Sequence, residues 1–392
     1  MKTRLSVSRT LKTWIALLVV AGPLIGVAGP GEASAATCVS WTGTQPANPS
    51  SIENILTSTA VLSSCNAWAV GHYYNGTANQ TLIEHWNGAS WKQVAGVNPG
   101  GSSNDHSLSG VRAVSATNIW AVGEYFDGTS TKTLIEHWNG TAWTQVASPN
   151  PSSSANDLDS LYAISATSIW AVGSYYSGSA WETLIEHWDG TAWRHVPSPN
   201  PSATHNTLTA VAASSSTNAW AVGFIYNSSG AFQTFMLHWN GTAWKHVFTP
   251  HPGDSNGLYG VTALSSANAW AVGFFDNSSR TPQTLVLHWN GTSWAHVPSP
   301  SHGSLQNALQ AVTTISASNI WAVGYYHNGT NFQTLIEHWN GTSWKYVSSP
   351  DPGGSAQANV LYGVRASSPS NIWAVGYYSN ATSKLTLALH CC

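Results

Sequence analysis

The sequence predicts an all-β protein, a seven-bladed β-propeller with four antiparallel strands in each blade. The first observation is the tetrapeptide Trp-Ala-Val-Gly, which recurs at intervals of about 50 residues, the repeat length of a propeller blade. The second is a histidine that follows each copy at a nearly constant distance. A β-solenoid, the alternative repeat fold, would have shorter repeats. The copies begin at Trp68, Trp120, Trp170, Trp220, Trp270, Trp321 and Trp373.

The four strands of a blade can be read from one repeat unit. Residues 108–115 alternate between apolar and polar side chains, and residues 119–126 are rich in β-forming residues. Residues 133–138 alternate again, and residues 143–147 complete the set after a two-residue Asn-Gly hairpin turn. No segment keeps a 3.6-residue period, so strands are expected throughout the repeats.

The two ends of the repeat region predict that the ring closes on itself. The last unit stops at His390-Cys391-Cys392, where the other units continue into a hairpin turn and a fourth strand. Near the start of the chain, Trp41 lies at the distance before Trp68 that separates a fourth-strand tryptophan from the next repeat. We therefore expect residues 38–42 to supply the missing fourth strand of the seventh blade.

The four cysteines favour disulfides, because they belong to a chain that carries an export signal. Cys38 and Cys392 occupy positions equivalent to neighbouring turn residues in other blades, so the sequence predicts that they pair. Cys65 is then expected to pair with Cys391, and a bond between Cys38 and Cys391 is the alternative. Adjacent cysteines at a chain end lack the spacing of metal ligands, so no metal site is predicted.

Residues 1–35 are predicted to be a secretory signal peptide. Basic residues precede an apolar run at 14–28, and Ala33-Ser34-Ala35 offers the small residues that signal peptidase requires. Retention of the apolar run as a membrane anchor is the alternative, although the run is short and contains a proline. Residues 36–392 are expected to form a single extracellular domain with no membrane span.

The composition excludes several classes of function. The chain has 13 Lys and Arg against 16 Asp and Glu, so it lacks the basic excess that nucleic-acid binding requires. The acids outside the repeat pattern, among them Glu124, Asp157 and Asp159, are dispersed over different blades. No nucleophile turn, phosphate-binding loop or metal motif is present in the sequence. We therefore expect a protein that is not an enzyme and that uses no cofactor.

The repeated segments Trp-Ala-Val-Gly and Leu-Ile-Glu-His-Trp-Asn-Gly-Thr-x-Trp resemble the repeats of secreted bacterial β-propellers. They are also loosely similar to kelch and tectonin-type lectin propellers. The resemblance implies a propeller over the whole chain after residue 35. It brings no catalytic residue, because neither the copper ligands of galactose oxidase nor the arginine cluster of sialidases can be matched.

One tryptophan lies outside the repeat positions and suggests a place for binding. Trp181 falls in a connection between the second and third strands, and the aligned positions of two other blades hold Phe232 and Phe332. Exposed aromatic rings beside polar residues suit the apolar face and hydroxyl groups of a sugar. The alternative is that the three rings only cover blade edges. Further candidate ligand-binding residues are Tyr175, Tyr325, Asn227, Asn328 and Asn331.

The connections also predict which face of the ring binds. In a four-stranded meander the second-to-third and fourth-to-first connections share one face, and here they are longer and more variable than the others. Binding residues concentrate on variable loops, so this long-loop face is the expected binding face. The repeat histidines are expected to act as hydrogen-bonding groups within blades rather than as a ring of ligands.

These observations favour a secreted, lectin-like propeller that binds cell-surface or cell-wall carbohydrate. The alternative is a protein-interaction scaffold or targeting subunit of a secreted complex, such as an antibacterial toxin particle. A glycoside hydrolase or lyase is the least favoured function. The expected partner is therefore a carbohydrate or a secreted protein.

Overall fold

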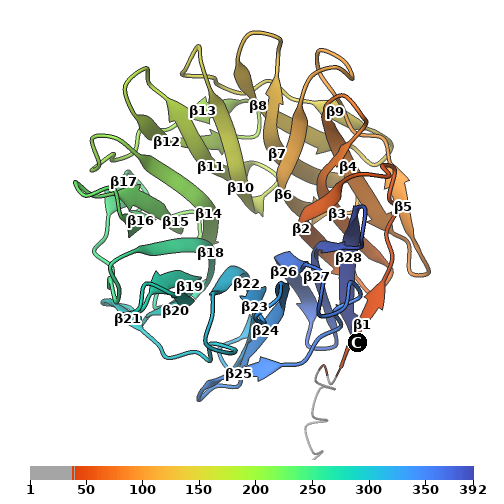
Figure 1. Cartoon of the computed structure of the whole chain (residues 1–392). Helices are drawn as coiled ribbons and strands as arrows, with labels where there is room; N and C mark the ends of the chain where they lie inside the picture. The colour runs from red at the N-terminus through yellow and green to blue at the C-terminus, as the bar shows by residue number, and fades with distance from the viewer. Residues whose placement is uncertain (1–37, 39) are drawn as a thin grey trace, which may run out of the picture. The chain divides into compact units, whose positions relative to one another are not determined.

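The computed structural model describes residue 38 and residues 40–392, which form a ring of seven four-stranded antiparallel sheets (Figure 1). The predicted seven-bladed fold is confirmed. The predicted signal peptide lies outside the described residues. Within residues 38–392, leaving out residue 39, no helix has the length and apolar character needed to cross a membrane.

In each blade the first three strands follow one another outward from the centre of the ring in chain order. The inner strands are β2 (Asn54–Ser63), β6 (His106–Ser115), β10 (Asn156–Ser165), β14 (Asn206–Ser215), β18 (Asn256–Ser265), β22 (Asn307–Ser316) and β26 (Asn359–Ser368). The second strands are β3 (Asn66–Tyr74), β7 (Asn118–Phe126), β11 (Ser168–Tyr176), β15 (Asn218–Tyr226), β19 (Asn268–Asp276), β23 (Asn319–His327) and β27 (Asn371–Ser379).

The strands in the outer half of each blade are shorter than those in the inner half. The third strands are β4 (Asn79–Trp86), β8 (Thr131–Trp138), β12 (Trp181–Trp188), β16 (Phe232–Trp239), β20 (Pro282–Trp289), β24 (Phe332–Trp339) and β28 (Lys384–Cys391). The fourth strands are short: β5 (Trp91–Val94), β9 (Trp143–Gln145), β13 (Trp193–His195), β17 (Trp244–His246), β21 (Trp294–His296), β25 (Trp344–Val347) and β1 (Trp41–Thr44).

Tryptophan packing between neighbouring blades forms the core. Trp68 of the first blade is buried, and its ring centroid lies 5.0 Å from that of Trp138 and 5.6 Å from that of Trp143 in the second blade. The same three-ring cluster recurs around the ring, for example where Trp120 meets Trp188 and Trp193. Each buried indole removes about 200 Å² from water, which stabilises the fold by about 5 kcal/mol before entropy is counted.

The repeat histidines bind within their own blades, as expected. The ring of His137 lies 4.3 Å from that of Trp120, and its Nε2 is 3.0 Å from the Asn118 Oδ1 atom. Burial lowers the pKa of His137, so the neutral imidazole is favoured at neutral pH. Each histidine therefore fixes the start of the second strand and supports the buried tryptophan.

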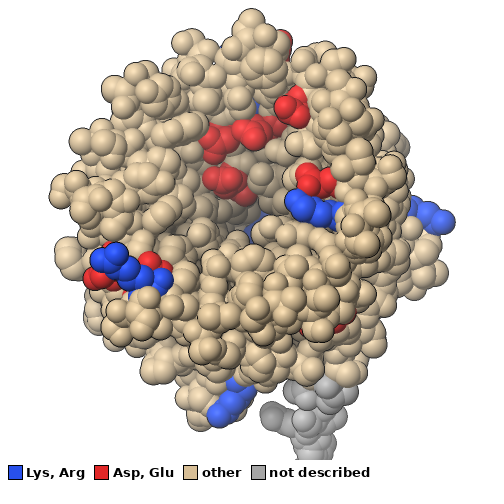
Figure 2. Space-filling model, viewed as in Figure 1, with Lys and Arg blue, Asp and Glu red and all other residues tan. Residues whose placement is uncertain are grey.

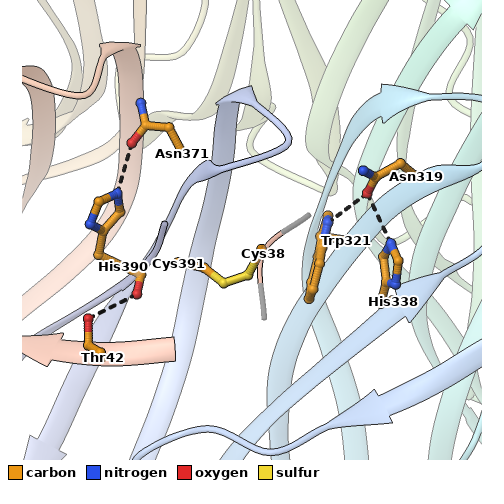
Figure 3. Close-up of a disulfide and its surroundings, with 8 residues drawn as sticks. All are labelled: Cys38, Thr42, Asn319, Trp321, His338, Asn371, His390 and Cys391. Carbon is orange, nitrogen blue, oxygen red and sulfur yellow. Dashed lines mark hydrogen bonds between the residues drawn. A yellow bond between two sulfur atoms is a disulfide. The ribbon is translucent and has the colours of Figure 1, made fainter. Parts of the chain in front are cut away.

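The predicted closure of the ring is confirmed. Strand β1 pairs with β28, with Trp41 opposite Cys391, so the fourth strand of the last blade comes from the start of the described chain (Figure 1). A disulfide joins Cys38 to Cys391, whose Cα atoms are 5.4 Å apart (Figure 3). The two ends of the described chain are thus held together by both backbone pairing and a covalent bond.

This pairing corrects the one expected from the sequence, which joined Cys38 to Cys392 and Cys65 to Cys391. Cys391 is fully buried in the place of a third-strand tryptophan and packs with Trp321, on the side where Cys38 lies. Successive strand residues point to opposite faces, so Cys392 is turned away and is exposed. Cys65 is exposed in the turn between β2 and β3. Neither Cys65 nor Cys392 forms a disulfide with a described residue.

The glycine of each Trp-Ala-Val-Gly segment is required by close backbone approach. A Cβ atom on Gly123 would overlap the carbonyl oxygen of Ser107 in the neighbouring inner strand. We expect Gly123→Ala to lower the free energy of unfolding by about 3 kcal/mol, because backbone must move to relieve the overlap. Urea denaturation measures this change. Gly43→Ala is the control, since its Cβ would meet only Leu389 Cδ2 at 3.9 Å and should change stability little.

Candidate binding funnel at the channel mouth

Every inner strand carries an irregularity that turns one side chain toward the central channel. In β10 the register shifts between Leu158 and Ser160, which leaves Asp159 as an extra residue opposite β11. Such a bulge re-aims the side chain that it carries. The equivalent residues line a central cavity of about 430 Å³. They are Thr57, Ser109, Asp159, Thr209, Tyr259, Gln310 and Tyr362.

Two of these seven residues serve the fold. The Thr57 hydroxyl donates to the carbonyl oxygens of Val70 at 3.0 Å and Leu108 at 2.7 Å, and so links two blades. Thr209 links the fourth and fifth blades in the same way, through the carbonyl oxygens of Val222 and Leu258. In contrast, the side chains of Asp159, Tyr259, Gln310 and Tyr362 make no hydrogen bond to another described residue. Their polar atoms are therefore available to a ligand.

Three carboxylates gather on one side of the channel mouth. Burial raises the pKa of Asp159 well above its ordinary value, with added repulsion from Asp157 and Glu124. Burial likewise raises the pKa of Asp157 to about 7, and Glu124 adds to the rise. Figure 2 shows carboxylates grouped around the central hollow of this face. We call the central cavity and its mouth the funnel, and Glu124, Asp157 and Asp159 the acidic side of the funnel.

The acidic side corrects the expectation that these acids are dispersed. Glu124 follows the Trp-Ala-Val-Gly segment of the second blade, while Asp157 and Asp159 flank a core leucine in the third. The end of β7 and the start of β10 lie on the same face of the ring in adjacent blades, so residues that are distant in the sequence come close together. The signal that could have found them is position in the repeat: residues on either side of the inner-strand leucine, and the residue after the glycine.

Aromatic rings occupy the opposite part of the mouth. The Tyr259 and Phe274 rings are stacked with centroids 5.7 Å apart, and those of Tyr362 and Tyr377 are 6.0 Å apart. Burial raises the pKa of Tyr259 and Tyr362, so both phenols remain neutral donors. We call these four residues, with Phe224 and Tyr325, the aromatic side of the funnel. It is an apolar surface with a few hydroxyl groups.

Two of the aromatic residues singled out from the sequence extend the aromatic side outward. Phe232 contacts Phe224 with ring centroids 4.9 Å apart, and Phe332 contacts Tyr325 at the same centroid distance. Trp181 lies elsewhere: it is half-buried at the start of β12 and packs on Tyr176 and His205. Its contacts fit the alternative of a residue that covers a blade edge.

The polar candidates are engaged in local structure. Asn227 Oδ1 accepts hydrogen bonds from the backbone of Ser229 and Ala231, and Asn328 Oδ1 accepts from Thr330. Asn331 Nδ2 and the Tyr175 hydroxyl also have partners within the protein, the Ala356 carbonyl and Glu182 Oε2. Their use in ligand binding stays a prediction.

The funnel combines an acidic side with an aromatic side. Among residues 38 and 40–392, no three His, Cys, Asp or Glu side chains are arranged to hold a metal ion. The three carboxylates of the acidic side are instead spread over two adjacent blades at the channel mouth. Acceptors on one side and neutral aromatic donors on the other suit a ligand that has both cationic and apolar parts.

Comparisons with known proteins define the class as a seven-bladed β-propeller. No family model and no curated protein matches the sequence. The fold is similar to that of YCF48 from Cyanidioschyzon merolae, with a TM-score of 0.54 and 13% identity over 90% of this chain and 99% of that one. It is also similar to YCF48 bound to D1 peptide, with a TM-score of 0.53, 13% identity and coverage of 90% and 96%. The likeness to kelch and tectonin-type propellers stays a prediction.

Proposed function

We propose that the protein is a secreted, non-enzymatic binding propeller that takes a segment of a partner protein into the funnel. The observation that carries this proposal is the variation at the seven bulge positions. The Trp-Ala-Val-Gly segment and the inner-strand leucine, which build the fold, are the same in all seven blades. The bulge positions differ in charge and size although they share one geometry. Selection by an asymmetric ligand explains that difference.

Two further observations support a protein partner. The large apolar side chains that are exposed among the described residues are Ile52, Phe126, Phe248 and Leu305. All four lie in or beside second-to-third or fourth-to-first connections. Exposed apolar groups are typical of protein interfaces. A protein of similar fold, YCF48, has been solved bound to D1 peptide.

Carbohydrate is the second candidate ligand. The aromatic side continues outward through Phe232 and Phe332, which gives flat apolar surface beside hydroxyl groups. Sugars stack their apolar faces on such rings. A targeting role in a larger secreted assembly is compatible with either ligand.

Selection of displayed peptides tests the proposal. A library of random peptides is panned on the chain from residue 36 to residue 392, with counter-selection on the Tyr259→Ala/Tyr362→Ala double variant. We expect enriched peptides whose dissociation constants rise at least about tenfold in the double variant, because two central aromatic contacts are lost. Trp181→Ala is the matched control and should leave peptide affinity unchanged.

The same proteins are applied to a glycan array. Glycan binding that depends on Tyr259 and Tyr362, without selectable peptides, replaces the proposal by the carbohydrate candidate. If neither peptides nor glycans distinguish wild type from the double variant, the funnel is not the binding site. Unchanged thermal unfolding of the double variant rules out loss of the fold as the cause of weaker binding.

A further inference from the structure

A second, smaller cavity of about 210 Å³ lies at the rim of the funnel between the first two blades. Its wall includes Asn79 at the start of β4, Asp105 and His106 at the start of β6, and Glu124 of β7. Glu124 also belongs to the acidic side, so this cavity and the acidic side have one residue in common. We call it the rim pocket.

The rim pocket holds a buried polar atom with no partner. His106 is only 1% exposed, and its Nε2 lies 2.7 Å from the Pro99 carbonyl oxygen. That oxygen can only accept, so Nε2 must carry the proton and Nδ1 of the neutral ring is an acceptor. Nδ1 is buried and meets no donor among the described residues. A buried acceptor without a donor destabilises the fold, and a bound donor would remove that cost.

His106 is also a departure from the repeat. The other six inner strands begin with asparagine: Asn54, Asn156, Asn206, Asn256, Asn307 and Asn359. In those blades the asparagine closes the preceding connection, as Asn156 does through hydrogen bonds to the backbone of Ser152. The fold therefore does not require histidine at this position.

Two carboxylates complete the set of acceptors. Burial raises the pKa of Glu124, and the neighbouring Asp105 adds to the rise. Neither carboxylate forms an ion pair with a lysine or arginine of the described chain. Asp105 Oδ1 accepts one hydrogen bond, from the backbone nitrogen of Asn79 at 2.8 Å. Glu124, Asp105 and His106 line the same pocket.

The equivalent site between the seventh and first blades shows which group can pair with a carboxylate at this position. Glu53 stands where Asp105 stands, and Lys384 begins β28 as Asn79 begins β4. The Lys384 ammonium lies 2.7 Å from Glu53 Oε2. Burial alone would raise the pKa of Glu53, but the interactions with Lys384 and His72 bring it below its ordinary value. There the chain supplies its own ammonium, whereas at the rim pocket Asn79 supplies none.

We propose that the rim pocket binds a primary ammonium group of the partner segment, with Asp105, Glu124 and His106 Nδ1 as acceptors. Three acceptors match the three N–H donors of an ammonium group. Tyr125 and Phe126 line the same pocket and give apolar surface for the methylene stem of a lysine. This assignment rests on the proposed function, because it describes one end of the segment that the funnel takes.

The test uses small amines as probes on the isotopically labelled chain from residue 36 to residue 392. Nα-acetyl-lysine N-methylamide presents a side-chain ammonium, and glycine N-methylamide presents an α-ammonium, so the two sources are distinguished. Nα,Nε-diacetyl-lysine N-methylamide is the uncharged control. We expect saturable shifts of the His106 ring nitrogens and of the backbone amides of residues 105–107 with one ammonium probe, and none with the uncharged probe.

Four variants make the assignment falsifiable. Glu124→Gln and His106→Asn should each weaken binding at least about tenfold, and His106→Asn restores the residue that six other blades use, so it should fold. Asn79→Lys should abolish binding, because it places an internal ammonium in the pocket as Lys384 does. Asp254→Asn removes one exposed negative charge elsewhere and should leave affinity unchanged.

Equal shifts with charged and uncharged probes, or unchanged affinity in Glu124→Gln and Asn79→Lys, would overturn the assignment. The absence of any saturable shift would also overturn it. If the amines bind but no peptide is selected by the funnel, the proposed function fails and the pocket stands. If peptides bind with an affinity that Asn79→Lys does not change, the pocket fails and the proposed function stands.

Discussion

Opening the covalent closure of the ring, with Cys38→Ser and Cys391→Ala, is expected to lower the free energy of unfolding by about 5 kcal/mol. The Cys38–Cys391 bond spans 353 residues, so its loss frees nearly the whole unfolded chain. The change also removes a buried sulfur that packs against Trp321. Guanidinium denaturation of the oxidised proteins measures the difference.

Two further variants separate the covalent bond from the packing. Cys38→Ser with Cys391→Trp restores the tryptophan that the other third strands carry before their hairpins, and should recover part of the loss. Cys65→Ser with Cys392→Ser leaves the bond intact, and we expect stability to change by less than about 0.5 kcal/mol. A large loss in the second variant would contradict the pairing that the structure shows.

The second large effect concerns buried glutamates of the third strands. Glu136 Oε2 accepts a hydrogen bond from the backbone nitrogen of Val97 at 3.0 Å, in the connection that leads into its blade. The equivalent connections before Glu186 and Glu337 carry Pro149 and Pro300, which have no N–H. Both carboxyl groups are fully buried, and none of their oxygens has a partner among the described residues.

Replacing these two glutamates by leucine is therefore expected to stabilise the protein, by about 2 kcal/mol for each at neutral pH. Three other blades already combine a proline in the connection with leucine in the strand, at Leu237, Leu287 and Leu389. Thermal unfolding of Glu186→Leu and Glu337→Leu measures the gain. No gain in either variant would show that the carboxyl groups are satisfied in solution.

The gain should depend on pH. Burial raises the pKa of Glu186 and Glu337 well above the ordinary value of 4.5. The folded state therefore holds protons that the unfolded state releases as pH rises above that ordinary value. The stability linked to these groups is fully present below pH 4.5, and it is lost as pH rises toward the folded-state pKa. The leucine variants should thus differ more from wild type at pH 7 than at pH 5.

Glu136→Leu provides the matched control for this effect. Burial raises the pKa of Glu136 to about 8, although the Val97 amide lowers it part of the way. Leucine here would leave the Val97 N–H without its acceptor, at a cost of about 1–3 kcal/mol. We therefore expect little gain or a net loss, which distinguishes relief of an unpaired carboxyl group from a general benefit of leucine.

The fold could be predicted from the sequence because its stabilising contacts repeat. Each blade presents the same Trp-Ala-Val-Gly segment, the same histidine and the same inner-strand leucine, so seven copies of one local pattern define strand, register and burial together. The closing strand at Trp41 followed from the same pattern. The disulfide partner did not, because a shift of one residue between Cys391 and Cys392 exchanges the two faces of a strand.

Only part of the candidate site could be predicted from the repeat pattern. Phe232, Phe332 and Tyr325 could be found because their aromatic rings depart from the repeat, although the structure places all three in strands rather than in loops. The acidic side was not recognised from the sequence, because Glu124 belongs to the second blade and Asp157 and Asp159 belong to the third. Only the fold shows that the three residues lie together at the channel mouth. His106 gave a signal, a histidine where six blades have asparagine, but its unpaired nitrogen is a property of the folded connection.

By itself the sequence determined the number of blades, their strand order and the meeting of the chain ends, because these depend on periodic burial that each unit repeats. Only the tertiary structure decided which variable side chains share the channel mouth and which buried groups lack partners. Curving the sheets into a ring brings inner strands from all blades to one axis, and the bulges turn one residue from each strand toward it. Proximity of that kind is set by ring geometry, which no single repeat contains.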